Sequence, residues 1–169
     1  PQYGNDKPRL FRLKKENSLI NRMGFNNKGV DYLVSKIATR KSSTIIGVSI
    51  GKNALTSIDK AAEDYLLCFK KVYPYADYVV ANISSPNTKD LRKLESKEYF
   101  SNLLTLLKKE QSNQKVKYGY KPFLLKLSPD LDEKHYEELA KEILASLRNP
   151  HLLNRFSYTP VPCESPQDG

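Results

Sequence analysis

The sequence predicts an α/β protein built around a parallel β-sheet, and two observations lead to this class. Short runs of β-branched and apolar residues alternate along the chain with longer segments whose apolar residues recur three and four positions apart. Continuous apolar runs are typical of strands buried on both faces, and the longer spacing gives a helix one apolar face. Because strands that alternate with helices form right-handed βαβ units, we expect three or four such units in one sheet.

The predicted order of elements begins with a short strand at Arg9–Leu13 and a helix at Val30–Ala38. Ser43–Ile50 is a nearly continuous β-branched and apolar run that ends at a glycine, which indicates a buried strand. The Thr-Ser pair at residues 56–57 can cap the helix that follows, since an aspartate stands three residues after the threonine. Apolar residues at helical spacing carry this helix to Tyr73.

The alternation then repeats in the second half of the chain. Asp77–Ile83 is another strand of the buried type, and Ser96–Lys109 places phenylalanine and leucine residues at helical spacing. Pro122–Leu127 is the next strand, and Asp130 or Asp132 can cap the helix after it.

The end of the chain differs from the rest. The last helix is expected to reach Leu144, and four of the ten prolines fall in the final 20 residues, where no periodicity continues. The 169 residues fit a single domain in length. We therefore expect one α/β unit at residues 1–144 and an irregular, proline-rich tail at residues 145–169.

Composition narrows the class of protein. The 28 lysines and arginines exceed the 19 aspartates and glutamates, and the net charge of +9 suits an anionic ligand, nucleic acid or an acidic membrane surface. No apolar run approaches the roughly 18 residues that span a bilayer, so no transmembrane helix is expected. Two cysteines make neither a disulfide framework nor a zinc cluster, and His135 and His151 have no partners at ligand spacing, so no metal site is expected. Without a signal-type segment or an initial Met, we expect a protein of a reducing compartment whose sequence lacks its natural start.

Polar segments follow the main predicted strands, and one more precedes the first clear helix. They are Asn21–Asn27, Gly47–Asn53, Asn82–Thr88 and Lys126–Asp130. Because ligands of parallel α/β sheets bind at the carboxyl ends of the strands, we expect these four segments to gather at one end of the sheet. The glycines and lysine of the second segment miss the spacing of a phosphate-binding loop, which disfavours a nucleoside triphosphate site.

Single residues in these segments allow two interpretations. Asn82 and Asn87 carry amides that donate and accept hydrogen bonds and so suit a planar heterocycle, but a turn imposed by Pro86 explains them as well. Lys126 is either a buried cation beside an anionic ligand or a side chain that reaches solvent. Composition alone favours the turn and the solvent-exposed lysine.

Together and in this order, the segments resemble the FMN-dependent dihydroorotate dehydrogenases of the quinone-linked, membrane-associated class. The resemblance begins near Gly4–Arg12, includes the Asn-Arg-Met-Gly-Phe, Asn-Ile-Ser-Ser-Pro-Asn-Thr and Leu-Lys-Leu-Ser-Pro-Asp motifs, and covers residues 1–144. It implies a (β/α)8 barrel, of which this chain holds about half of the βα units. It also implies oxidation of dihydroorotate to orotate in pyrimidine synthesis, in which a base takes a proton from C5, a hydride passes from C6 to flavin N5, and a quinone accepts the electrons.

The resemblance assigns roles by position in each motif. It implies that Ser85 is the catalytic base, where the soluble class carries a cysteine. The substrate ligands that it implies are Asn21, Arg22, Met23, Gly24, Phe25, Asn82 and Asn87. The FMN ligands that it implies are Ser49, Asn82 and Lys126. Because a serine hydroxyl alone is a weak base, Ser85 would need a relay through water or another hydroxyl.

Departures from the family pattern also carry predictions. The family usually has Asn at the position of Ser49 and Gly at that of Asp90, so we expect weaker flavin binding and a strained or repelled substrate loop. The first flavin-binding loop, the membrane-docking helices and the glycine-rich phosphate loops have no counterpart in the sequence. We therefore expect a truncated form of the enzyme, disrupted near residue 145, whose own activity the sequence leaves open.

The resemblance further implies a peripheral protein at the cytoplasmic face of the cell membrane, attached through segments that this sequence lacks. The alternative function is a non-catalytic basic remnant that binds anions or nucleic acid, suggested by the lysines at Lys108–Lys109 and Lys115–Lys121. A solvated surface explains these lysines better, and we expect no nucleic-acid partner.

Overall fold

The computed structural model describes residues 1–86 and 91–148. Its elements in chain order are β1 (Leu10–Leu13), β2 (Ser18–Asn21), α1 (Val30–Ile37), β3 (Gly47–Ile50), η1 (Ile58–Lys60), α2 (Ala61–Val72), β4 (Tyr78–Asn82), η2 (Leu91–Glu95), α3 (Lys97–Tyr118), β5 (Phe123–Lys126) and α4 (Glu133–Arg148). The predicted ligand Asn87, the departure at Asp90 and the tail from residue 149 onward lie outside the described residues.

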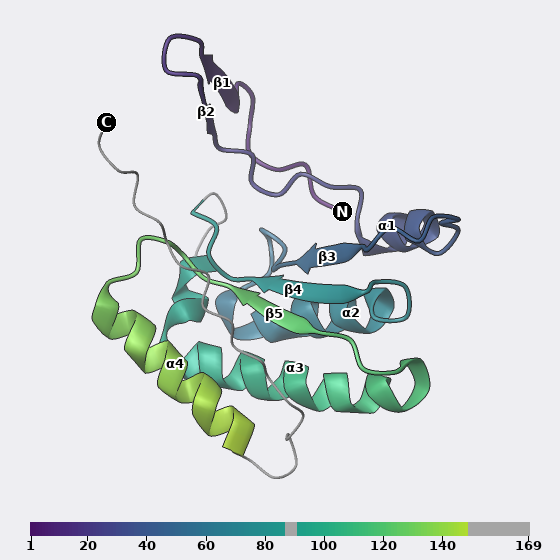
Figure 1. Ribbon diagram of the computed structural model, residues 1–169. Coiled ribbons are helices and arrows are strands. Elements are labelled where there is room, and N and C mark those ends of the chain that lie inside the picture. The colour runs from purple at the N-terminus through teal and green to yellow at the C-terminus, as the bar shows by residue number, and fades with distance from the viewer. Residues whose placement is uncertain (87–90, 149–169) are drawn as a thin grey trace, which may run out of the picture.

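A parallel sheet in the order β3-β4-β5 forms the centre of the fold (Figure 1). Helices α2 and α3 lie along one face of this sheet, α1 packs against α2, and α4 packs against α3. Each of the three strands is followed by a helix, so the chain forms successive βαβ units. The predicted α/β class with a parallel sheet is confirmed.

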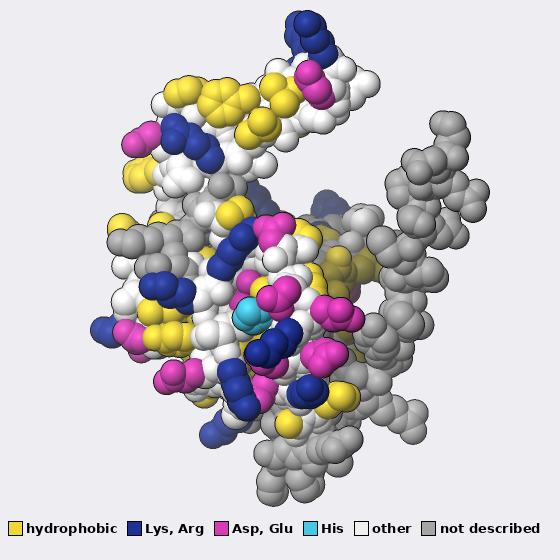
Figure 2. All heavy atoms as spheres, turned by 90° about the vertical axis from the view of Figure 1, so that its left-hand side faces the viewer, with side chains coloured by type: hydrophobic (Ala, Val, Ile, Leu, Met, Phe, Trp, Pro, Cys, Tyr) yellow, Lys and Arg dark blue, Asp and Glu magenta, His cyan; other side chains and the backbone are white. Residues whose placement is uncertain are grey.

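The hairpin of β1 and β2 lies outside this layered arrangement. Its strands are antiparallel and pair Phe11 with Ile20. Every residue of β2 is exposed, so the alternation of buried and exposed positions that marks a strand is missing, and the sequence does not predict this strand. The hairpin projects from the rest of the molecule, and hydrophobic side chains gather on it (Figure 2).

Some elements begin or end away from their predicted bounds. β3 starts at Gly47 rather than Ser43, and its first register partner is Tyr78 at the start of β4. α3 extends beyond the predicted Lys109 and ends where Gly119 adopts a φ of +76°. Ser57 precedes the short turn η1 and makes no capping hydrogen bond.

Helix α4 begins with a side-chain cap. The Oδ1 atom of Asp132 accepts a hydrogen bond from the backbone N–H of His135 at 2.8 Å, which satisfies a donor of the first turn. Asp132 rather than Asp130 is therefore the cap that the sequence left open. The helix continues to Arg148, past the boundary predicted at residue 144.

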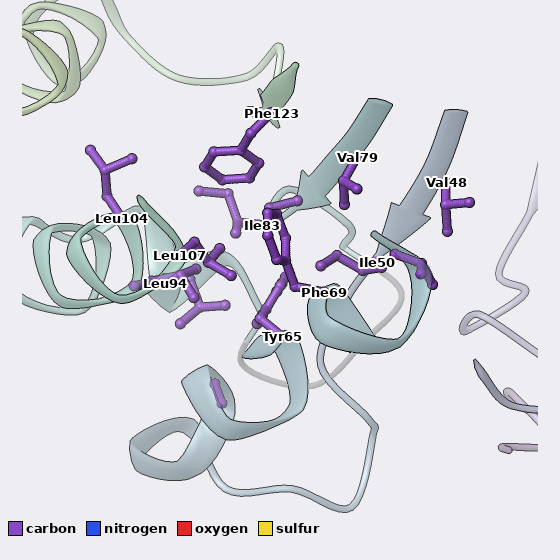
Figure 3. Close-up of a cluster of buried hydrophobic side chains, with 14 of the residues drawn as sticks. Val48, Ile50, Tyr65, Phe69, Val79, Ile83, Leu94, Leu104, Leu107 and Phe123 are labelled. Atoms are coloured by element: carbon purple, nitrogen blue, oxygen red, sulfur yellow. The ribbon is translucent and has the colours of Figure 1, made fainter. Parts of the chain in front are cut away.

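Alternate side chains of the strands build the core on the helical side of the sheet (Figure 3). Val48, Val79 and Phe123 point from β3, β4 and β5 toward α2 and α3. On α2, the Phe69 ring meets the Phe123 ring edge to face, with centroids 5.7 Å apart. This contact joins helix and sheet at the middle of the core.

The other face of the sheet carries the residues that position the site. In register across the strands, Gly47 lies beside Tyr78, Ser49 lies beside Val80, and Val80 lies beside Leu124. A Cβ on Gly47 would come within 2.0 Å of the Tyr78 ring, so glycine makes room for that ring. In the described part of the chain no helix covers this face, and Leu124 is 47% exposed. We call it the open face.

Candidate functional site

The carboxyl ends of the three strands bring the predicted polar segments together. A Cβ on Gly51, just after β3, would lie 3.6 Å from the backbone oxygen of Asn82 and 3.7 Å from the Phe25 ring. At the neighbouring strand end, Asn82 and Lys126 are register partners on the open face. The four polar segments therefore meet at one end of the sheet, as the parallel topology predicts.

Ser84 lies at the centre of this group. The ammonium group of Lys126 donates a hydrogen bond to the Ser84 Oγ atom at 3.1 Å. The Ser84 hydroxyl and backbone N–H both donate to the Oδ1 atom of Asn82, at 3.1 and 3.2 Å. Ser84 is 3% exposed, whereas Asn82 is partly buried and Lys126 is exposed to solvent, so the serine is the shielded member of this network. The sequence motif contains Ser84, but spacing gives no reason to select it over its neighbour.

The backbone of Asn82 is held from the helical side. The Tyr65 hydroxyl on α2 donates to the Asn82 carbonyl oxygen at 2.7 Å. Burial raises the pKa of Tyr65 well above its ordinary value, so this hydroxyl stays protonated and remains a donor. Tyr65 appears in the sequence only as part of an apolar helix face, and its polar role depends on the packing.

Ser85, the predicted base, follows Ser84 directly and is partly buried. It precedes Pro86 in the loop after β4, so its position is tied to that of the Ser84 network. The predicted substrate ligand Asn87 falls outside the described residues.

The Asn-Arg-Met-Gly-Phe loop splits into two parts. Phe25 packs against the core and its ring approaches Gly51, at the strand end. Gly24 is buried with a φ of +70°, and a Cβ there would lie 2.9 Å from Asn5, so the loop requires glycine. The exposed Arg22 instead donates to the backbone oxygens of Pro8 at 3.0 Å and of Asp6 at 3.4 Å, and so holds the N-terminal segment.

The remaining residues of this loop lie between these two parts. Met23 is partly buried, and its backbone oxygen accepts a hydrogen bond from the Asn5 N–H at 3.0 Å. Asn21 is exposed at the end of β2, and its Oδ1 atom accepts from the Met23 N–H at 3.3 Å. Of this predicted set, Phe25 is the side chain that reaches the strand ends.

Two further contacts join the loop after β4 to the loop after β5. Arg92 donates through Nε to the Ser84 backbone oxygen at 3.3 Å and through Nη2 to the Asp130 carboxylate at 2.7 Å. The buried Glu95 carboxylate accepts from the backbone N–H of Ser128 at 2.7 Å. Arg92 and Glu95 are not predicted from the sequence. Their partners Asp130 and Ser128 stand more than 30 positions away, so no local pattern points to these contacts.

The donors at this end of the sheet fit a flat, acceptor-rich cofactor such as FMN. Gly51 has no side chain and Ser49 has a short one at these strand ends, and Lys126 adds a positive charge there. The neighbouring Lys52 is 2% exposed and donates to the backbone oxygens of Asn53 and Thr56, so it closes its own loop. Among the described side chains, no group of three or more His, Cys, Asp or Glu could hold a metal ion.

The lysines that suggested anion binding lie elsewhere. Lys115 and Lys117 stand near the C-terminal end of α3, at the far end of the molecule from the strand ends (Figure 1), and Lys121 follows the helix. Lys108 and Lys109 lie in the middle of α3, and Lys108 is 2% exposed and donates to the Gln111 Oε1 atom at 3.0 Å. Lys117 lies over the Tyr118 ring at 5.1 Å and Lys115 over the Tyr120 ring at 5.9 Å. These contacts explain part of the basic cluster as local cation–π pairs.

Comparison with known proteins identifies the family. The family model described as dihydroorotate dehydrogenase matches residues 1–153. The chain belongs to the dihydroorotate dehydrogenase family. This family is flavin-dependent, and the predicted resemblance and the predicted partial barrel are both confirmed.

Individual family members support the quinone-linked class. The chain is 50% identical over 145 residues to the dihydroorotate dehydrogenase (quinone) of Psychrobacter arcticus, which covers 85% of this chain and 42% of that one. It is 52% identical over 141 residues to the enzyme of the same name from Coxiella burnetii, covering 83% and 41%. The crystal structure of the Eimeria tenella DHODH in complex with ferulenol superposes with a TM-score of 0.75 at 33% identity, covering 86% of this chain and 44% of that one.

The chain thus spans less than half of the length of these relatives. Among its described helices, none combines the length and the apolarity that crossing a membrane requires.

Proposed function

We propose that this chain is part of a quinone-linked dihydroorotate dehydrogenase and carries the central portion of its site for FMN and dihydroorotate. The observation that carries the proposal is the network of Lys126, Ser84 and Asn82 beside Ser85, at the carboxyl ends of three parallel strands. Relatives named dihydroorotate dehydrogenase (quinone) match 145 and 141 residues of this chain at 50% and 52% identity. The whole enzyme would use a quinone as electron acceptor and lie peripherally at the cytoplasmic face of the membrane.

The chain's own residues would divide the work by their chemistry. Lys126 would place a positive charge against the flavin, and Ser49 and Asn82 would add hydrogen bonds. Asn21, Arg22, Met23, Gly24, Phe25, Asn82 and Asn87 would surround the substrate. Ser85 would accept the proton from substrate C5, passing it on through water or a neighbouring hydroxyl. Bound FMN would supply the acceptor for the hydride from C6.

The direct test is to purify the chain and to titrate it with FMN, following flavin fluorescence and absorbance. We expect a yellow complex that dihydroorotate bleaches under anaerobic conditions. A colourless protein that does not change flavin fluorescence would refute cofactor binding by this chain.

Replacing the proposed base separates chemistry from binding. Ser85→Ala should slow flavin reduction by about 100-fold or more while FMN stays bound, because general-base catalysis typically contributes at least that factor. The matched control is Ser35→Ala, an exposed serine on α1 that should leave both properties unchanged. Unchanged flavin reduction by Ser85→Ala would remove Ser85 from the proposed role.

A further inference from the structure

Ser84 joins three segments through all of its polar atoms. Its Oγ atom lies 3.1 Å from both the Lys126 Nζ atom and the Asn82 Oδ1 atom. Its backbone N–H lies 3.2 Å from the same Oδ1 atom, and its backbone oxygen accepts from Arg92 at 3.3 Å. The residue is 3% exposed, so water cannot easily replace these partners.

The chemistry of the partners fixes the direction of each hydrogen bond. An ammonium group and a backbone N–H can only donate. The Ser84 hydroxyl must therefore accept from Lys126, which leaves its single proton for Asn82. The Asn82 atom nearest to the Ser84 N–H must be an acceptor, so it is the amide oxygen and not the nitrogen.

This assignment orients the amide of Asn82. Its oxygen accepts two hydrogen bonds from Ser84. The NH₂ group, on the opposite side of the planar amide, therefore faces away from Ser84. Asn82 lies on the open face beside Lys126. This end of the sheet therefore presents hydrogen-bond donors, the Asn82 NH₂ and the Lys126 ammonium, side by side.

We propose that Ser84 is a positioning residue that locks the Asn82 amide with its NH₂ outward and couples it to Lys126. The pair then binds the acceptor edge of a planar heterocycle, such as carbonyl oxygens flanking a ring nitrogen. The identity of that heterocycle rests on the proposed function, whereas the orientation of the amide is a property of this chain alone.

The orientation is tested by NMR on labelled protein without any ligand. The Cγ resonance of Asn82, assigned by its loss in Asn82→Asp, reports hydrogen bonds accepted by its oxygen. Ser84→Ala should shift this resonance upfield, Ser84→Thr should restore it in part, and Ser35→Ala should leave it in place. An unchanged Cγ resonance in a folded Ser84→Ala variant would overturn the proposal. If Ser84→Ala fails to give a native circular dichroism spectrum, Ser84→Cys replaces it, since a thiol keeps the volume but donates weakly.

Binding gives a second readout. We expect Ser84→Ala to weaken FMN or orotate binding about tenfold. Lys126→Met should weaken binding less in the Ser84→Ala background than in the wild type, because the two residues act through one network. Fully additive effects would contradict the coupling. If the wild-type chain binds neither molecule, the proposed function fails, and the Asn82 resonance still decides the orientation.

Discussion

At the scale of single residues, Ser49 stands where the family resemblance predicts an asparagine. It lies exposed on the open face, in register with Val80, one step before the strand end. A serine hydroxyl reaches less far than the asparagine amide usual in the family and offers fewer hydrogen bonds. If Ser49 contacts the cofactor as proposed, it should provide a weaker contact than asparagine would.

Restoring the longer side chain should strengthen flavin binding. Ser49→Asn is expected to lower the Kd for FMN by up to about tenfold, the net worth of one or two added hydrogen bonds. Fluorescence titration measures the change, and Ser35→Asn on α1 controls for the effect of an added amide elsewhere. Equal or weaker FMN binding by Ser49→Asn would argue against the proposed role of this position.

At the scale of elements, one carboxylate ties the starts of β3 and β4 to the loop before them. Asp77 accepts hydrogen bonds from the Arg40 guanidinium at 2.8 and 3.2 Å and from the Ile46 backbone N–H at 2.8 Å. The Arg40 hydrogen bonds, with that of Ile46, lower the pKa of Asp77 from 3.8 to about 2. A carboxyl group whose pKa is lower in the folded state stabilises the fold above its unfolded pKa and loses that effect as the pH falls.

The stability conferred by Asp77 should therefore disappear between about pH 4 and pH 2. Urea unfolding is expected to show Asp77→Asn less stable than the wild type at pH 7, with the difference shrinking to a small remainder near pH 2. The control is Asp6→Asn, in the exposed N-terminal segment. A difference that stays constant from pH 7 to pH 2 would contradict the role of the Asp77 charge.

Helix α2 depends on the sheet for its stability through Phe69. The side chain is fully buried between the Tyr73 ring, at 5.3 Å, and the Phe123 ring of β5. Phe69→Ala should destabilise the fold by about 3–5 kcal/mol, because it leaves a cavity that packed neighbours cannot fill. The control on the same helix is Leu67→Ala, which is 53% exposed and should change the free energy of unfolding by less than about 0.5 kcal/mol.

At the scale of the whole molecule, the helices among residues 1–86 and 91–148 pack on one face of the sheet and leave the other face open. Within the described residues, β3 and β5 each pair on one side, with β4 between them. The open face exposes Leu124 at 47%, and Ile45 just before β3 is exposed at 75%. Unpaired strand edges next to exposed apolar side chains favour association with other chains.

This surface should be detectable in solution. The wild-type chain is expected to enhance the fluorescence of anilinonaphthalene sulfonate and to self-associate on sedimentation, and Leu124→Glu should reduce both effects. Val116→Glu is the matched control, since Val116 is 90% exposed on α3, away from the open face. If the control lowers the signal as much as Leu124→Glu does, the open face is not the surface responsible.

The sequence alone determined the fold class, the order of the three main strands and the family. These depend on local periodicity and on motifs in a fixed order, which a chain displays before it folds. Ser85 and Lys126 could be named in the same way, because each has a recognisable place in its motif. Their roles as base and flavin partner remain predictions.

The tertiary structure decided what the polar residues do to one another. Ser84 gains its importance only when β4 and β5 align and bring Lys126 within hydrogen-bond distance, and Arg92 only when it reaches Asp130 across two loops. The exposed strand β2 likewise depends on pairing with β1 rather than on a buried face. Such contacts join residues that are distant in sequence. They depend on the register between neighbouring strands, which the local sequence pattern of one strand does not reveal.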